Sequence, residues 1–83
     1  MIVKLYSTLR LDYAKGHGYD ADGGVEVSVP GPVCVNRLCE MIGVDASKVS
    51  FASVNGRMLR DFDKSLEPGV SEIGLHPQAP AGG

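Results

Sequence analysis

The sequence predicts an α+β fold in which one main helix covers one face of a mixed sheet of four or five strands. Three observations carry this prediction. Apolar and polar residues alternate with period two in residues 3–6, 25–29 and 72–76, as in strands with one buried face. Residues 35–42 carry a single apolar stripe with helical spacing. Asn55-Gly56 is the favoured pair for a two-residue hairpin turn.

The first two strands are expected to form a hairpin. Val3 and Leu5 alternate with Lys4 and Tyr6, and the run Val25–Val29 ends at Pro30, which cannot donate a ladder hydrogen bond. The glycine-rich connection from Thr8 to Gly24 is expected to be a long mobile loop. Lys4 and Tyr6 should point away from the helix, either as an ordinary outer face or as part of a partner surface.

The predicted helix begins at Pro32, where a missing N–H costs nothing, and runs for about eleven residues. Its apolar stripe consists of Val35, Leu38, Cys39 and Ile42, and Gly43 suits the left-handed position that follows a helix. Cys34 and Cys39 would project from different sides of this helix, so they are expected to remain reduced thiols. Whether Cys34, near the helix start, is reactive stays open.

The rest of the chain completes the sheet. Val49–Val54 is expected to be the third strand, residues 58–60 a short fourth strand, and Ile73–Leu75 the core of a last strand that stops at Pro77. Leu66 is the expected core anchor of the polar segment between them. This order of elements is the β-grasp arrangement, with a domain over residues 1–77 and a flexible tail over residues 78–83.

Composition excludes several classes of function. A net charge of -2 offers no basic face for nucleic acid or for an anionic membrane, and no apolar run is long enough to span a bilayer. The first residues lack the features of a signal peptide. We therefore expect a cytoplasmic protein with no nucleic-acid or membrane partner.

Metal binding and side-chain catalysis have little support. His17, Asp20 and Asp22 could suggest a cation site, but the carboxylates that a calcium loop needs at its ends are absent, so a solvated loop is expected. No metal site and no bound cofactor are predicted. His76 is expected to cap the end of the last strand, and a role in orienting the tail inside a partner is the alternative.

The chain ends in Gly82-Gly83, preceded by Pro77 and Pro80. A C-terminal carboxylate is ionised at neutral pH and can attack the α-phosphate of ATP that a partner supplies. Two residues without Cβ atoms can pass through a narrow slot, and the prolines keep the approach extended. Taken alone, the dipeptide is better explained as a frayed end, because glycine-rich chain ends are common.

The whole chain, however, resembles the ubiquitin-like β-grasp sulfur carriers, which include the small subunit of molybdopterin synthase and the thiamine sulfur carrier. The matching segments, in order, are Val3–Arg10, Gly24–Pro30, Val54-Asn55-Gly56-Arg57, Leu66–Gly69 with Glu72-Ile73, and Gly82-Gly83. No single motif is specific; the order, the spacing and the terminal Gly-Gly are.

The resemblance implies that Gly83 and Gly82 are the functional residues. An E1-like adenylyltransferase, using its own ATP, would adenylate Gly83, and a desulfurase-type or rhodanese-type donor would convert it to a thiocarboxylate. A large synthase subunit or another acceptor enzyme would then receive the sulfur. The long 8–24 connection favours the molybdopterin or tungstopterin pathway over thiamine. The alternatives are a ubiquitin-like modifier joined to lysines through Gly83, and a binding module whose tail is incidental.

Overall fold

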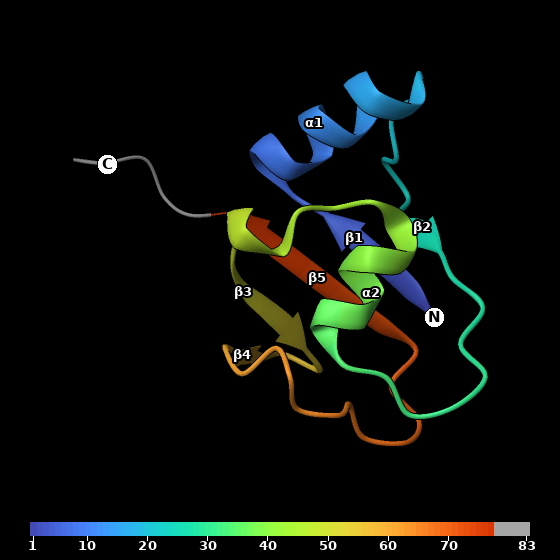
Figure 1. Ribbon diagram of the computed structural model, residues 1–83, viewed down its shortest axis with the longest axis vertical. Helices are drawn as coiled ribbons and strands as arrows, with labels where there is room; N and C mark the ends of the chain where they lie inside the picture. The colour runs from blue at the N-terminus through green and yellow to red at the C-terminus, as the bar shows by residue number, and fades with distance from the viewer. Residues whose placement is uncertain (78–83) are drawn as a thin grey trace.

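The computed structural model describes residues 1–77 as an α+β fold with the predicted β-grasp arrangement (Figure 1). Its elements are β1 (Ile2–Leu5), α1 (Ser7–His17), β2 (Val25–Glu26), α2 (Val35–Ile42), the 3-10 turn η1 (Ala46–Lys48), β3 (Val49–Val54), β4 (Arg57–Leu59) and β5 (Glu72–Pro77). The five strands form one sheet in the order β2-β1-β5-β3-β4. The predicted tail, residues 78–83, lies outside the described residues.

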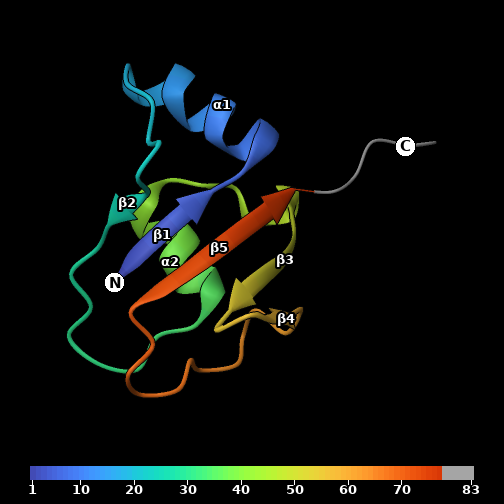
Figure 2. The same cartoon turned by 180° about the vertical axis from the view of Figure 1, so that it is seen from behind.

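The last strand of the described chain occupies the centre of the sheet (Figure 2). β5 pairs in parallel with β1, from Ile2 opposite Glu72 to Leu5 opposite Leu75, and antiparallel with β3. The predicted hairpin of the first two strands is confirmed, although β2 has only two residues. Two backbone hydrogen bonds between Met1 and Val27 continue the pairing beyond it.

The core lies between the sheet and α2, as the sequence predicts. The sheet contributes buried residues of β1, β3 and β5, and α2 contributes its whole apolar stripe: Val3, Leu5, Ala52, Ile73 and Leu75 from the strands, and Val35, Leu38, Cys39 and Ile42 from the helix. Gly43 follows the helix in the left-handed conformation with φ 78°. Leu66 is buried as predicted.

The predicted start of α2 at Pro32 is wrong, because the chain is paired just before the helix. The carbonyl of Val33 accepts a hydrogen bond from Leu66 N at 2.8 Å, and Cys34 forms a bridge with Ser65. These residues are therefore extended, and the helix begins at Val35.

The expected loop over residues 8–24 is also wrong in its first half, which forms the eleven-residue helix α1. Only Leu9 and Tyr13 of this helix are buried, so its apolar pattern is weak. Polar contacts add to the packing of these two residues. Arg10 donates to both carboxylate oxygens of Asp20 at 2.6 and 2.7 Å and lies 3.0 Å from Asp22. The connecting segment is thereby fastened to the helix.

A β-bulge at Ser50 shapes the end of β3. Phe51 pairs with His76, but Pro77 pairs with Val49, so Ser50 is an extra residue on β3. The bulge turns Val49 into the core, where it is 5% exposed, and leaves Phe51 on the opposite face of the sheet. Both apolar side chains are accommodated only because the alternation is interrupted between them.

Candidate functional site on the open face of the sheet

The face of the sheet opposite α2 carries side chains in rows, which the strand register defines. Lys4, Gly74, Ser53 and Met58 lie side by side on β1, β5, β3 and β4. The next row, toward the end of β5, consists of Tyr6, His76 and Phe51. In Figure 2 this face of the sheet lies in front of α2. We call it the open face.

Three rings of the second row form a continuous stack. The His76 ring lies 4.5 Å from the Tyr6 ring at an interplanar angle of 5°, and 4.4 Å from the Phe51 ring at 7°. Such near-parallel pairs add stabilisation beyond the burial of their area. The stack joins the end of β1 to β5 and β3 one residue before Pro77. We call these three residues the ring clamp.

Gly74 makes the ring clamp sterically possible. A Cβ atom at this position would lie 2.8 Å from Tyr6 Cε2 and 3.4 Å from His76 Nε2, so the rings occupy the space that a side chain would need. Gly24 packs closely against β1, where a Cβ atom would meet Ile2 Cγ2 at 2.7 Å. It also has φ 94°, which favours glycine.

His76 is joined to Ser53 by a hydrogen bond of 3.1 Å between Nε2 and Oγ. Burial lowers the pKa of His76, which favours the neutral imidazole. A serine activated by histidine also needs a carboxylate to orient the ring. Within residues 1–77 no carboxylate is hydrogen-bonded to His76, and the nearby Glu72 is paired with Lys4 at 3.7 Å. The pair is a side-chain contact between β3 and β5.

The predicted site residues are placed as follows. Gly82 and Gly83 lie outside the described residues. Lys4 and Tyr6 point away from α2 as predicted, and Tyr6 is 41% exposed. The prediction that His76 caps a strand end is wrong, because β5 is central and the ring packs between two neighbouring side chains.

The residues considered for metal binding have other partners. Asp20 and Asp22 contact Arg10, and the Arg10 guanidinium lowers the pKa of Asp20. His17 stacks on Tyr13 with ring centroids 3.8 Å apart. Across residues 1–77 no three histidine, cysteine or acidic side chains are grouped as metal ligands would be. The same residues include no helix that is long and apolar enough to cross a bilayer.

Both cysteines are free thiols, as predicted. Cys39 lies in the core, 1% exposed, and burial raises its pKa to about 11. A thiol in that environment is a poor nucleophile. Cys34 is partly exposed immediately before α2 and has no side-chain hydrogen bond there.

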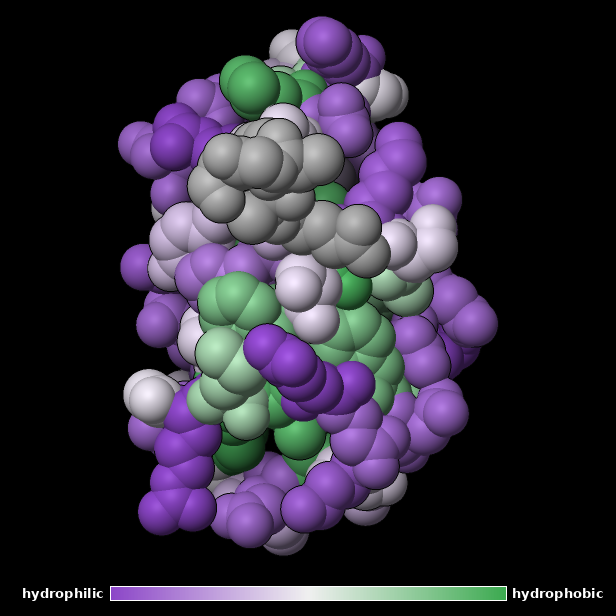
Figure 3. Space-filling view, turned by 90° about the vertical axis from the view of Figure 1, so that its left-hand side faces the viewer, coloured by the Kyte–Doolittle hydropathy of each residue, from purple (hydrophilic) through white to green (hydrophobic). Residues whose placement is uncertain are grey.

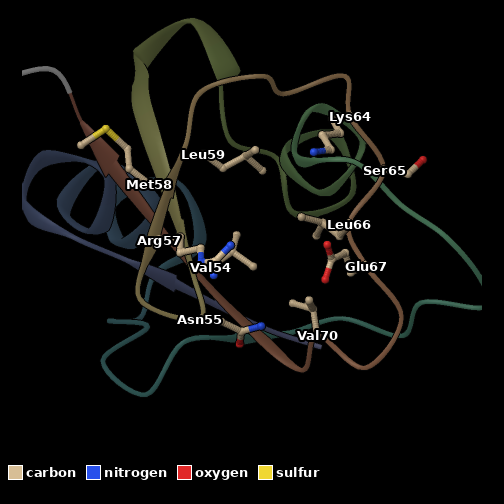
Figure 4. A pocket seen from close by; sticks show the side chains of 10 residues that line it. All are labelled: Val54, Asn55, Arg57, Met58, Leu59, Lys64, Ser65, Leu66, Glu67 and Val70. Carbon is tan, nitrogen blue, oxygen red and sulfur yellow. The ribbon is translucent and has the colours of Figure 1, made fainter.

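A second surface feature is a pocket of about 510 Å³ between the β3–β4 hairpin and the segment that leads to β5. Figure 4 shows Val54 on the strand side and Leu66 and Val70 on the other side. Apolar side chains also gather on the side of the molecule that carries β3 and β4 (Figure 3). Arg57, Lys64 and Glu67 surround the pocket, so its rim carries both signs of charge.

Sequence reasoning missed Phe51 and Gly74 as members of the open-face cluster. A signal for Phe51 is visible in the run Val-Ser-Phe-Ala-Ser-Val, in which the adjacent apolar residues Phe51 and Ala52 interrupt the alternation. Gly74 stands in the middle of an apolar strand, where glycine often marks a close approach of other atoms.

Comparison of the chain with protein-family models, curated proteins and solved structures found no match.

Proposed function

We propose that this protein is a sulfur carrier whose Gly83 carboxylate is adenylated and then converted to a thiocarboxylate for cofactor biosynthesis. The observation that carries the proposal is the combination of a β-grasp sheet with β5 at its centre and a Gly82-Gly83 end six residues after that strand.

The chemistry takes place on the partners. A carboxylate oxygen of Gly83 attacks the α-phosphorus of ATP, and pyrophosphate leaves. A persulfide sulfur of the donor then attacks the acyl carbon, and AMP leaves. A thiol reductant cleaves the resulting S–S bond, and Gly83 keeps the sulfur as a thiocarboxylate. Glycine at both positions allows the chain to approach such a site closely.

Candidate partners are an E1-like adenylyltransferase, a desulfurase or rhodanese that supplies sulfur, and an acceptor such as a large synthase subunit for molybdopterin or tungstopterin. The length of the segment between β1 and β2 supports this branch over the thiamine branch. The compartment proposed for all of them is the cytoplasm.

Intact mass measurement tests the proposal. The purified chain must first show a mass that places Gly83 at its carboxyl end. Incubation with the adenylating enzyme, ATP and the sulfur donor should then replace one oxygen by one sulfur, and a chain without Gly83 should not react.

Two outcomes would contradict the proposal. One is a wild-type mass that never changes under these conditions. The other is the appearance of Gly-Gly remnants on lysines of other proteins without any thiocarboxylate, which would identify a protein modifier instead.

A further inference from the structure

We propose that His76 is a positioning residue: through the ring clamp it fixes the direction of the chain at Pro77, from which Gly83 is delivered to a partner's active site. The inference rests on the proposed function, because it concerns how the same carboxylate is presented. Its structural half, the fixing of the end of β5, can be measured without any partner.

The ring clamp holds β5 from both sides at its last described residues. Tyr6 follows β1 directly, and its backbone N–H donates to the Leu75 carbonyl at 3.3 Å. Phe51 of β3 pairs with His76 of β5, and the pairing of the two strands continues to Pro77. His76 is therefore fastened by two rings and by the hydrogen bond to Ser53. The strand end is held by side chains as well as by its backbone.

The direction of the chain at this point matters because six residues separate Pro77 from Gly83. A chain of that length reaches at most about 20 Å, so the position and direction of Pro77 determine the region within which Gly83 can be presented. A reacting group misplaced by about 1 Å can lose 100-fold in rate. Fixing the root of the segment lowers the entropy that must be lost when Gly83 is inserted into a narrow site.

Two other uses of these rings fit the geometry less well. Aromatic side chains that bind nucleobases offer their ring faces, whereas both faces of His76 are covered by Tyr6 and Phe51. General-base catalysis by His76 would need an orienting carboxylate, and none is hydrogen-bonded to it among the described residues. The arrangement suits a role that depends on the shape and planarity of the ring.

The kinetic test compares His76→Ala with His76→Phe, which keeps a planar ring in the stack. With the adenylating enzyme, ATP and the sulfur donor, His76→Ala should lower kcat about tenfold, because fewer docked complexes have Gly83 in place. Its KM should stay within about twofold of the wild-type value, and His76→Phe should restore most of kcat. Assays are run well below the lowest unfolding temperature, so that reduced stability alone changes neither constant.

Two matched controls separate this role from others. Glu72→Gln changes the same strand and the same face, four residues before His76, and should leave kcat unchanged. Leu59→Ala removes a partly buried side chain of β4 outside the clamp and lowers stability without touching the rings. It should also leave kcat unchanged at the assay temperature.

Nuclear magnetic resonance supplies the second readout. The amides of Leu75 and His76 should lose order in His76→Ala and keep it in His76→Phe. Unchanged order of these two amides in His76→Ala would overturn the inference. A rise in KM with an unchanged kcat in His76→Ala would also overturn it, because that pattern marks a docking contact. If the wild-type chain gains no sulfur at all, the proposed function fails, and the amide order alone then decides whether the clamp exists.

Discussion

A Cβ atom on Gly74 would lie 2.6 Å from the Oγ atom of Ser53, a separation that real Cβ atoms essentially never show. The two residues are directly opposite each other on β5 and β3. The same position would bring the Cβ within 2.8 Å of the Tyr6 ring, so neither neighbour can move without disturbing the ring clamp.

We therefore expect Gly74→Ala to lower the free energy of unfolding by about 1–3 kcal/mol, as overpacking generally does. Urea denaturation measures the change. Gly16→Ala is the matched control, since its added Cβ meets no atom within 4 Å outside its chain neighbours and the adjoining helix backbone. Alanine in a helix should stabilise by about 0.5–1 kcal/mol. A Gly74→Ala variant as stable as the wild type would contradict the close packing described here.

The two thiols should differ in reactivity. Iodoacetamide at pH 8 should alkylate the native protein once, at Cys34, because Cys39 is buried and its pKa is raised to about 11. In denaturing urea both thiols should react. Peptide mass mapping locates the label, and Cys34→Ser should leave the native chain unlabelled. Rapid labelling of native Cys39 would show that the core opens easily.

Lower pH should destabilise the protein through His76. Its pKa in the folded state is lowered from 6.5 by burial, so the unfolded chain binds the proton first as the pH falls. The contribution of neutral His76 to stability is therefore full above about pH 6.5 and is lost as the pH falls through the folded-state pKa. The Lys4–Glu72 ion pair lies on the same face of the sheet.

Thermal unfolding of the wild type and His76→Phe over a series of pH values measures this contribution. The phenylalanine variant keeps the ring but cannot titrate, so it should lose less stability between pH 7.5 and pH 5. Identical pH profiles would show that His76 is equally easy to protonate in both states.

Tyr13 should titrate at unusually high pH. Its hydroxyl lies 3.0 Å from that of Tyr19, and this hydrogen bond, with burial, raises the pKa of Tyr13 to about 12. The near-ultraviolet absorbance of tyrosinate follows the titration. Tyr19→Phe removes the larger cause and should bring the Tyr13 transition closer to its ordinary value of 10.0. A transition that Tyr19→Phe leaves in place would assign the shift to burial alone.

The parts of the fold that the sequence predicted are those in which burial follows a regular period. The stripe of α2 has helical spacing, and Asn55-Gly56 specifies a hairpin, so both were predictable from local pattern. The helix α1 was not, because its two buried residues are too few for a periodic signal. Its contact between Arg10 and Asp20, across ten residues, is also one that no local pattern reveals.

The candidate site was predictable only in part. Lys4 and Tyr6 could be assigned to the open face from the alternation of β1. The stacking of His76 could not, because it requires the position of β5 between β1 and β3 and the bulge at Ser50. Strand order and bulges arise from the tertiary fold, whereas alternation is written along a single strand.

The central place of β5 has a consequence for biosynthesis. β5 separates β1 from β3 and is the last of the described elements to leave the ribosome. The sheet therefore cannot be assembled before residues 72–77 have been synthesised. A nascent chain that ends before residue 72 contains β1 and β3 but lacks β5, the strand that pairs with both. Contacts between the first and last strands also make folding slow relative to a fold with local contacts. A shortened product that lacks β5 would therefore be without the strand that joins β1 to β3.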